Sequence, residues 1–127
     1  MKKFIEDRQK WASFYNDKIK NISWLKPQYI PDYISQHAWQ SYVGYVDPKK
    51  SPKERNEIMD YLDMKGISTR PGTHAIHMLS FYKNEYGFKA DQFIGAKLCD
   101  QNTIAIPLHN KMVPEDYQYV VDTLKEI

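Results

Sequence analysis

The chain has 127 residues, of which 42% are hydrophobic and 27% are charged, and its formal charge at neutral pH is only +2. This length and composition indicate one folded domain and exclude a disordered or fibrous protein. Because no block of basic residues accompanies the many tyrosines, the charge pattern argues against a protein that binds nucleic acid. The single cysteine, Cys99, excludes a disulfide framework and a zinc module built from several cysteines.

The sequence offers no segment suited to export or to membrane insertion. The first residues briefly imitate a signal peptide, but Glu6, Asp7 and Arg8 end the apolar stretch. The longest uncharged stretch, residues 33–46, is too short and too polar to cross a bilayer. We therefore expect a protein of the reducing cytoplasm that has no membrane partner.

The first third of the chain predicts a helix, an extended passage and a strand. Residues 4–22 have apolar side chains at helical spacing, and the large aromatics Trp11 and Tyr15 suggest that this helix docks against something sizeable. Pro27 and Pro31 then favour an extended, turn-rich passage. Residues 36–47, rich in aromatic and β-branched side chains, predict a long strand.

The clearest helix start follows at Ser51-Pro52-Lys53-Glu54. The serine is a predicted N-cap, the proline occupies the first helical position, and the glutamate completes a capping box. Apolar residues at Ile58, Tyr61 and Leu62 would form the buried face of this helix. Gly66 is its predicted left-handed stop.

The remaining pattern predicts a short strand, two helices, a strand and a final helix. The strand covers residues 67–70, a helix capped by Thr73 ends near Gly87, and a second helix covers residues 90–99. Residues 103–108 predict a strand, and the last helix follows Pro114. With only three credible strands, we predict an α+β fold whose small sheet is covered by helices on one face.

The densest polar cluster in the sequence runs from Arg70 to His77. It combines a strand end, a glycine turn and the predicted start of a helix, with His74 and His77 three residues apart on that helix. Free backbone N–H groups at a helix start attract anions, and Arg70 could add a two-pronged donor. One interpretation is therefore recognition of a phosphate, carboxylate or polyhydroxyl ligand. The other is a capped helix whose histidines only cover the strand beneath it.

Other candidate chemistry is weaker. A metal site at His74 and His77 would need a third ligand, and no other pair has ligand spacing, so we predict no metal. Cys99 follows the apolar face of its predicted helix, which favours a buried thiol over a nucleophile. Phosphate-binding and hydrolase glycine motifs are absent, and the residues alone supply no complete catalytic set.

In their order and spacing, several short motifs together resemble one family. The matching pieces are Arg8, Ala12 and Tyr15; residues 37–42; residues 55–62 with Gly66-Ile67 and Thr69; residues 75–82; and Ile106-Pro107-Leu108 with Met112, Glu115-Asp116, Val120 and Leu124. Across nearly its whole length, the chain resembles the C-terminal small domain of the DegT/DnrJ/StrS family. These are pyridoxal-phosphate-dependent aminotransferases of fold type I that act on nucleotide-linked sugars.

The resemblance implies that this chain is one part of a larger enzyme. Residues 1–24 would form a helix that bridges to an absent large domain, and residues 25–127 would form an α+β small domain with a mainly antiparallel sheet of three to four strands. The large domain would supply the catalytic lysine and hold pyridoxal phosphate, so this chain should contain no catalytic and no cofactor-binding residue and should be inactive alone. The parent would transfer an amino group, typically from glutamate, to a nucleotide-linked keto-sugar, and it would form homodimers.

The resemblance also gives roles to the polar cluster. It implies that Arg70, His74 and His77 help to bind the sugar nucleotide. Gly72-Thr73 departs from the His-Tyr that many relatives have at this point, which suggests a divergent substrate. Two alternatives remain: a free-standing α+β module that binds an anionic metabolite at the loop from Arg70 to His77, and an interaction domain whose first helix docks on another protein.

Overall fold

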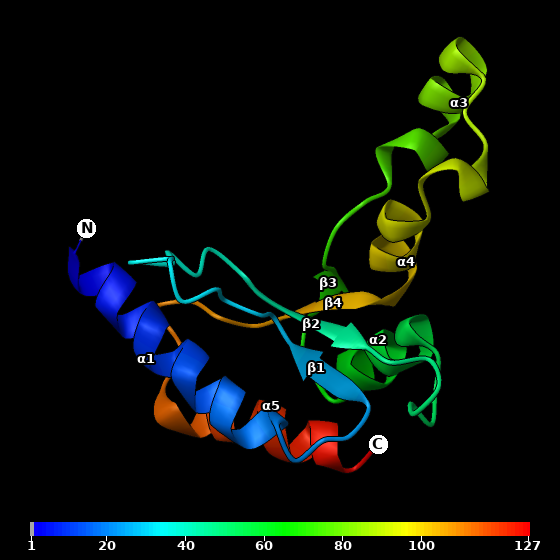
Figure 1. The fold of residues 1–127 in the computed structure, drawn as a ribbon. Coiled ribbons are helices and arrows are strands. Elements are labelled where there is room, and N and C mark those ends of the chain that lie inside the picture. Colours follow the sequence, from blue (N-terminus) through cyan, green and yellow to red (C-terminus); the bar gives the residue numbers. More distant parts are fainter. Residues whose placement is uncertain (1) are drawn as a thin grey trace.

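The structure is a computed structural model that describes residues 2–127. Its long first helix, α1 (Lys2–Ile19), lies beside the last helix, α5 (Pro114–Lys125) (Figure 1). Trp11 of α1 stacks on Tyr117 of α5 with ring centroids 4.1 Å apart. Tyr15, which is fully buried, packs against Tyr42 and Tyr117. The large aromatics of α1 therefore find partners within this chain, so they do not by themselves indicate an outside partner.

The sheet has four antiparallel strands in the order β1-β2-β4-β3. The strands are β1 (Leu25–Pro27), β2 (Tyr42–Val46), β3 (Arg70–Pro71) and β4 (Thr103–Ile106). Alternate residues of β2 (Tyr42, Gly44 and Val46) face the core with Ile104 and Ile106 of β4. The predicted α+β class with a small antiparallel sheet is confirmed.

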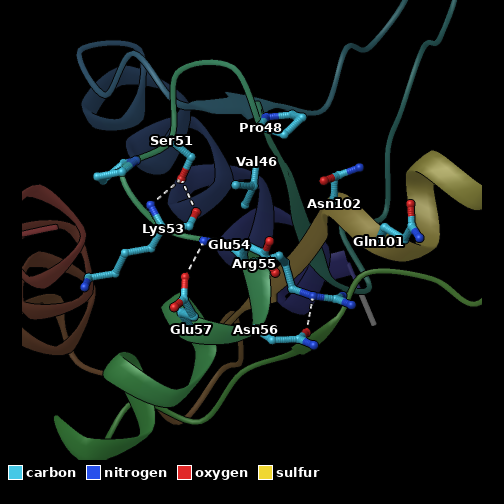
Figure 2. A pocket seen from close by; sticks show the side chains of 11 residues that line it. Val46, Pro48, Ser51, Lys53, Glu54, Arg55, Asn56, Glu57, Gln101 and Asn102 are labelled. Carbon is cyan, nitrogen blue, oxygen red and sulfur yellow. Dashed lines mark hydrogen bonds between the residues drawn. The ribbon is translucent and has the colours of Figure 1, made fainter.

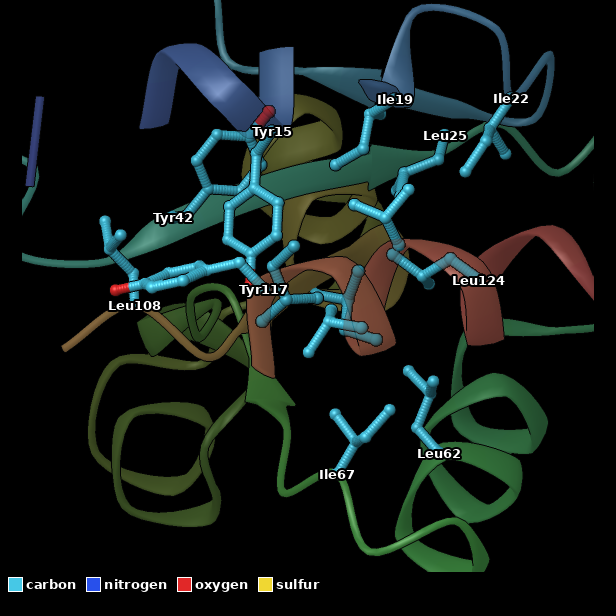
Figure 3. Close-up of a cluster of buried hydrophobic side chains, with 14 of the residues drawn as sticks. Tyr15, Ile19, Ile22, Leu25, Tyr42, Leu62, Ile67, Leu108, Tyr117 and Leu124 are labelled. Carbon is cyan, nitrogen blue, oxygen red and sulfur yellow. The ribbon is translucent and has the colours of Figure 1, made fainter. Parts of the chain in front are cut away.

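The core lies between this face of the sheet and the helices α1, α5 and α2 (Arg55–Met64). Its labelled side chains converge in Figure 3, where tyrosines fill one end of the core and aliphatic side chains fill the other. The buried face of α2 consists of Ile58 and Leu62, two of the three residues predicted, whereas the third, Tyr61, is only half-buried. Gly66 stops this helix with a φ of 76°, a left-handed conformation that glycine adopts without strain.

The segment between β3 and β4 projects away from the core (Figure 1). It contains two short 3-10 helices, η1 (Ile76–Met78) and η2 (Ala90–Phe93), and two helices, α3 (Ser80–Tyr86) and α4 (Ile94–Asn102). We call residues 72–102 the arm. Neither α3 nor α4 contains a buried residue, so the arm is not part of the main core.

Several predicted boundaries were wrong. The strand expected over residues 36–47 begins only at Tyr42, because Trp39 takes a left-handed φ of 48° that no strand can accommodate. The strand expected over residues 67–70 is reduced to Arg70–Pro71, and an additional strand, β1, occurs where a turn-rich passage was expected.

Helix starts were also misplaced. The cap of α2 is Glu54 rather than Ser51, whose hydroxyl instead donates to the carbonyl of Lys53. The carboxylate of Glu57 reaches back to accept from the backbone N–H of Glu54 at 2.8 Å, so a capping contact forms three residues later than predicted. The helix expected from Thr73 is broken into η1 and α3, and the one expected over residues 90–99 divides into η2 and α4, which extends to Asn102.

Candidate functional site

Arg70 lies at the edge of the sheet. The backbone of Arg70 pairs with that of Ala105 in β4, and the Arg70 side chain is exposed. Pro71 pairs with Ile104, and the backbone N–H of Gly72 donates to Thr103 at 3.1 Å. These contacts hold the backbone in place where the chain leaves the sheet. The Arg70 side chain therefore extends into solvent from a fixed backbone position.

The backbone of Gly72 lies very close to side chains of the neighbouring strands β2 and β4. A Cβ at this position would lie 2.5 Å from the Cγ1 of Val43 and 2.6 Å from the Oγ1 of Thr103. These distances are below ordinary contact, so no larger side chain fits without a shift of β2 or β4. Glycine is therefore required here by packing.

The loop that follows is not a helix start. Ala75 has an extended backbone, and its N–H donates to the Asp100 carboxylate of α4 at 3.1 Å. The exposed His74 ring lies beside the same carboxylate, with Nδ1 3.6 Å from its Oδ1. The N–H of Ala75, one of the backbone donors predicted to bind an anion, is thus already bonded to a carboxylate of the chain itself.

His77 is the one buried histidine of the predicted set, with 6% of its surface exposed. Its Nε2 lies 3.1 Å from the carbonyl of Ala90, and because a carbonyl can only accept, Nε2 must carry the proton. The ring also meets Phe93 edge-on at 5.0 Å. His77 therefore joins the two halves of the arm, η1 and η2.

The three predicted residues consequently occupy different settings. Arg70 and His74 are exposed to solvent, whereas His77 is enclosed by the arm. Negative charge from Asp100 stands next to His74 and opposes an anion at that point. The expected cluster on a single helix face does not form, because residues 73–75 are extended.

A cavity of about 590 Å³ lies elsewhere, between the turn from β2 to α2 and the end of α4 (Figure 2). Lys53, Glu54, Arg55 and Glu57 line it with both signs of charge. Arg55 is already engaged, because its Nη1 donates to the carbonyl of Thr103 at 2.8 Å. No sequence motif indicated this cavity, because its walls come from two separate segments that meet only in the folded chain.

The sequence model of the DegT/DnrJ/EryC1/StrS aminotransferase family matches residues 1–125. The chain belongs to this family. Two curated relatives match 94% of the chain: the spore coat polysaccharide biosynthesis protein SpsC of Bacillus subtilis, at 28% identity, and the MJ1066 protein of Methanocaldococcus jannaschii, at 26%. The chain spans 31% of the length of each.

Solved structures share the fold. The PMP form of Spr1654 from Streptococcus pneumoniae, a proposed sugar aminotransferase, superposes on 98% of the chain with a TM-score of 0.85 at 23% identity. PseC of Helicobacter pylori, an aminotransferase involved in the biosynthesis of pseudoaminic acid, superposes on 97% with a TM-score of 0.84 at 16% identity. The chain covers 31% and 32% of these two structures.

The chain's residues do not fit a pyridoxal phosphate site. A Schiff-base lysine needs a lowered pKa and a sheltered position. Among residues 2–127 every lysine is exposed except Lys97, which is half-buried and paired with Asp91. A hydrogen bond with Asp47 raises the pKa of Lys26, and one with Glu126 raises the pKa of Lys65. The family's cofactor would therefore have to be held by other parts of the enzyme.

Three further sequence expectations concern Cys99, metal-binding side chains and membrane-spanning helices. Cys99 is exposed on α4, so the prediction of a buried thiol was wrong; the apolar side of this helix has no core to face. In the part of the chain that the structure describes, no three metal-binding side chains come together. None of the helices within residues 2–127 combines the length and apolar composition that crossing a membrane would take.

Proposed function

We propose that the chain is the small domain of a pyridoxal-phosphate-dependent aminotransferase that acts on a nucleotide-linked keto-sugar. The observation that carries this proposal is the family match over residues 1–125, in a chain that spans less than a third of its relatives. A relative named for polysaccharide biosynthesis and a structural neighbour named as a sugar aminotransferase support a sugar substrate. Glutamate is the proposed amino donor, and a homodimer the proposed assembly.

In this proposal the cofactor and the reactive lysine belong to a larger domain that completes the enzyme. Pyridoxal phosphate would supply an electron sink for the transfer of the amino group. The chain's own contribution is recognition, from the edge of the sheet and the base of the arm. Residues 1–24 would connect it to the larger domain.

Arg70 and His74 are the proposed contacts to the sugar nucleotide. Both side chains are exposed, and both extend from backbone that is fixed by contacts with β4 or α4. His77 was predicted as a third contact and stays a prediction. Its hydrogen bond to Ala90 favours a supporting role, in which it shapes the arm that presents His74.

The first experiment compares this chain with the full-length parent after incubation with pyridoxal phosphate and reduction by borohydride, which makes a Schiff base permanent. Only the parent should gain a stoichiometric adduct at a single lysine, beyond the scattered labelling of exposed lysines, and only the parent should transaminate a keto-sugar. Turnover by the purified 127-residue chain would refute the assignment as a partial enzyme.

The second experiment separates the two substrates by measuring both half-reactions in the parent. Arg70→Ala and His74→Ala should lower kcat/KM for the sugar nucleotide and leave the amino-donor half-reaction unchanged. Asn84→Ala, an exposed position on α3, is the control. Equal losses in both half-reactions would contradict a role in sugar recognition.

The alternative is a free-standing module that binds an anionic metabolite. Titration with inorganic phosphate and a nucleoside diphosphate distinguishes the two. Tight binding by the isolated chain, lost in Arg70→Ala, would support the module instead.

A further inference from the structure

The arm carries an unusual share of the apolar surface of the molecule. Half of the large hydrophobic side chains exposed among residues 2–127 belong to this segment, seven of fourteen. Their exposed fractions run from 42% to 64%, and the residues are Ile76, Leu79, Phe81, Tyr86, Phe93, Ile94 and Leu98. We call these seven side chains the arm surface.

The arm surface approaches the size of one side of a protein interface. With roughly 200 Å² for a whole aromatic side chain and about 150 Å² for an aliphatic one, its exposed part is on the order of 650 Å². Apolar patches on monomers reach about 300–600 Å², and one side of a standard protein interface covers about 800 Å². The arm surface therefore resembles half of an interface.

The shape of the arm does not come from burying this surface. The contacts that hold it are internal: the hydrogen bond from His77 to Ala90, the edge-on packing of Phe88 and Phe93, and the ion pair of Lys97 with Asp91. These contacts leave the arm surface exposed to solvent, and the arm itself projects away from the core (Figure 1). A segment built in this way presents apolar groups to something outside the chain.

The charges of the arm indicate the chemistry of its partner. Three lysines are balanced by three acidic residues, namely Lys83, Lys89, Lys97, Glu85, Asp91 and Asp100. A balanced segment attracts neither a polyanion nor a polycation strongly. The complementary surface should therefore be apolar and nearly neutral, which describes a protein surface that is buried permanently.

We propose that the arm surface docks on the larger domain that completes the aminotransferase, an inference that rests on the proposed function. The full-length structures of Spr1654 and PseC superpose on 98% and 97% of this chain, so they contain the arm, and about two-thirds of each is additional protein. In such enzymes the same projecting segment exists beside a large domain. The additional protein in these two structures is the source of such a domain, and it makes the domain the occupant that the comparisons favour.

The test is a chimera of SpsC in which the third that matches this chain is replaced by residues 1–127. Amide hydrogen exchange of residues 76–98 is compared between the isolated chain and the chimera. Docking predicts at least about tenfold slower exchange in the chimera. Phe81→Ser and Ile94→Ser should abolish much of this protection, while Met64→Ser, an even more exposed apolar position on α2, should not.

The results separate docking from the proposed function, because cofactor reduction and transamination are measured on the same chimera. Protection of the arm without transamination would contradict the proposed function and support the proposed docking. Transamination with unprotected arm amides would sink the docking alone. An isolated chain that sediments as a dimer with its arm already protected would make a second copy the occupant and overturn the proposal.

A chimera that fails to fold leaves a second measurement. In full-length Spr1654, the positions that superpose on the arm surface should be buried by the rest of the same chain. If those positions are exposed to solvent, or are covered only by the other subunit, the proposal is wrong.

Discussion

Replacing Arg8 by methionine tests how the left-handed Trp39 is held. Arg8 extends from α1, and its Nη1 donates to the carbonyl of Trp39 at 2.8 Å and to the carbonyl of Gln40 at 2.7 Å. Trp39 has a φ of 48°, although its bulky side chain disfavours the left-handed region by about 1–2 kcal/mol. Methionine keeps the apolar stem of the side chain and removes these two hydrogen bonds, together with a longer one from Nε to the Oδ1 of Asn110 at 3.3 Å.

The expected cost follows from these contacts. Hydrogen bonds from a charged donor contribute about 1.5–3 kcal/mol when buried, and those of Arg8 are partly exposed, so we take about 1 kcal/mol for each. The total loss is about 2 kcal/mol, which corresponds to a decrease in Tm of roughly 6–10 °C for a chain of this size. Lysine at this position retains the charge but only a point-like donor, and it should lose about half as much.

The assay is urea denaturation followed by tryptophan fluorescence, together with amide exchange of residues 37–41. Lys3→Met, an exposed position on the same helix, removes the same charge and should change the unfolding free energy by less than about 0.5 kcal/mol. The reasoning is refuted if Arg8→Met behaves like this control, or if exchange at residues 37–41 does not accelerate.

Three further outcomes can be measured on the same chain. Gly72→Ala should cost about 1–3 kcal/mol of unfolding free energy, whereas Gly95→Ala, which has open space, should be neutral or stabilising; equal effects would contradict the packing argument. Asp47→Asn should destabilise at neutral pH, and its difference from wild type should begin to shrink as the pH falls below about 4 and disappear only below the pKa of Asp47, which the hydrogen bond with Lys26 lowers; a constant difference would exclude this linkage. Cys99 should react with a thiol reagent without denaturant, and protection until unfolding would disprove its exposure.

The elements with a strong apolar period were predictable from sequence. Helices at both ends and in the middle of the chain were expected, and α1, α5 and α2 are observed with the apolar faces that the spacing indicated. The strand β4 was also expected, within two residues of its observed end. These elements build the core, where local pattern and tertiary packing favour the same structure.

The wrong boundaries share a physical cause. Residues 36–41 were assigned to the strand that the aromatic and β-branched residues 42–46 indicate, yet the hydrogen bonds of Arg8 to Trp39 and Gln40 come from a helix about thirty residues earlier. The strand β1 is only Leu25–Pro27, and it exists because β2 lies beside it. Long-range contacts of this kind override local propensity, and no window of sequence contains both partners.

The candidate site was predicted by its residues but not by its geometry. The glycine turn and the histidines after it predicted a helix start whose free N–H groups could bind an anion. In the structure this loop instead places Ala75 and His74 against Asp100, which lies 25 residues after Ala75. His77 illustrates the same limit, since its partner Ala90 lies on the returning half of the arm. A histidine that is enclosed by the arm shapes that segment, whereas Arg70 and His74 remain free to meet a ligand. If the arm surface docks as proposed, the domain that covers it also determines where these two side chains point. Substrate recognition would then depend on the interface as much as on the residues themselves.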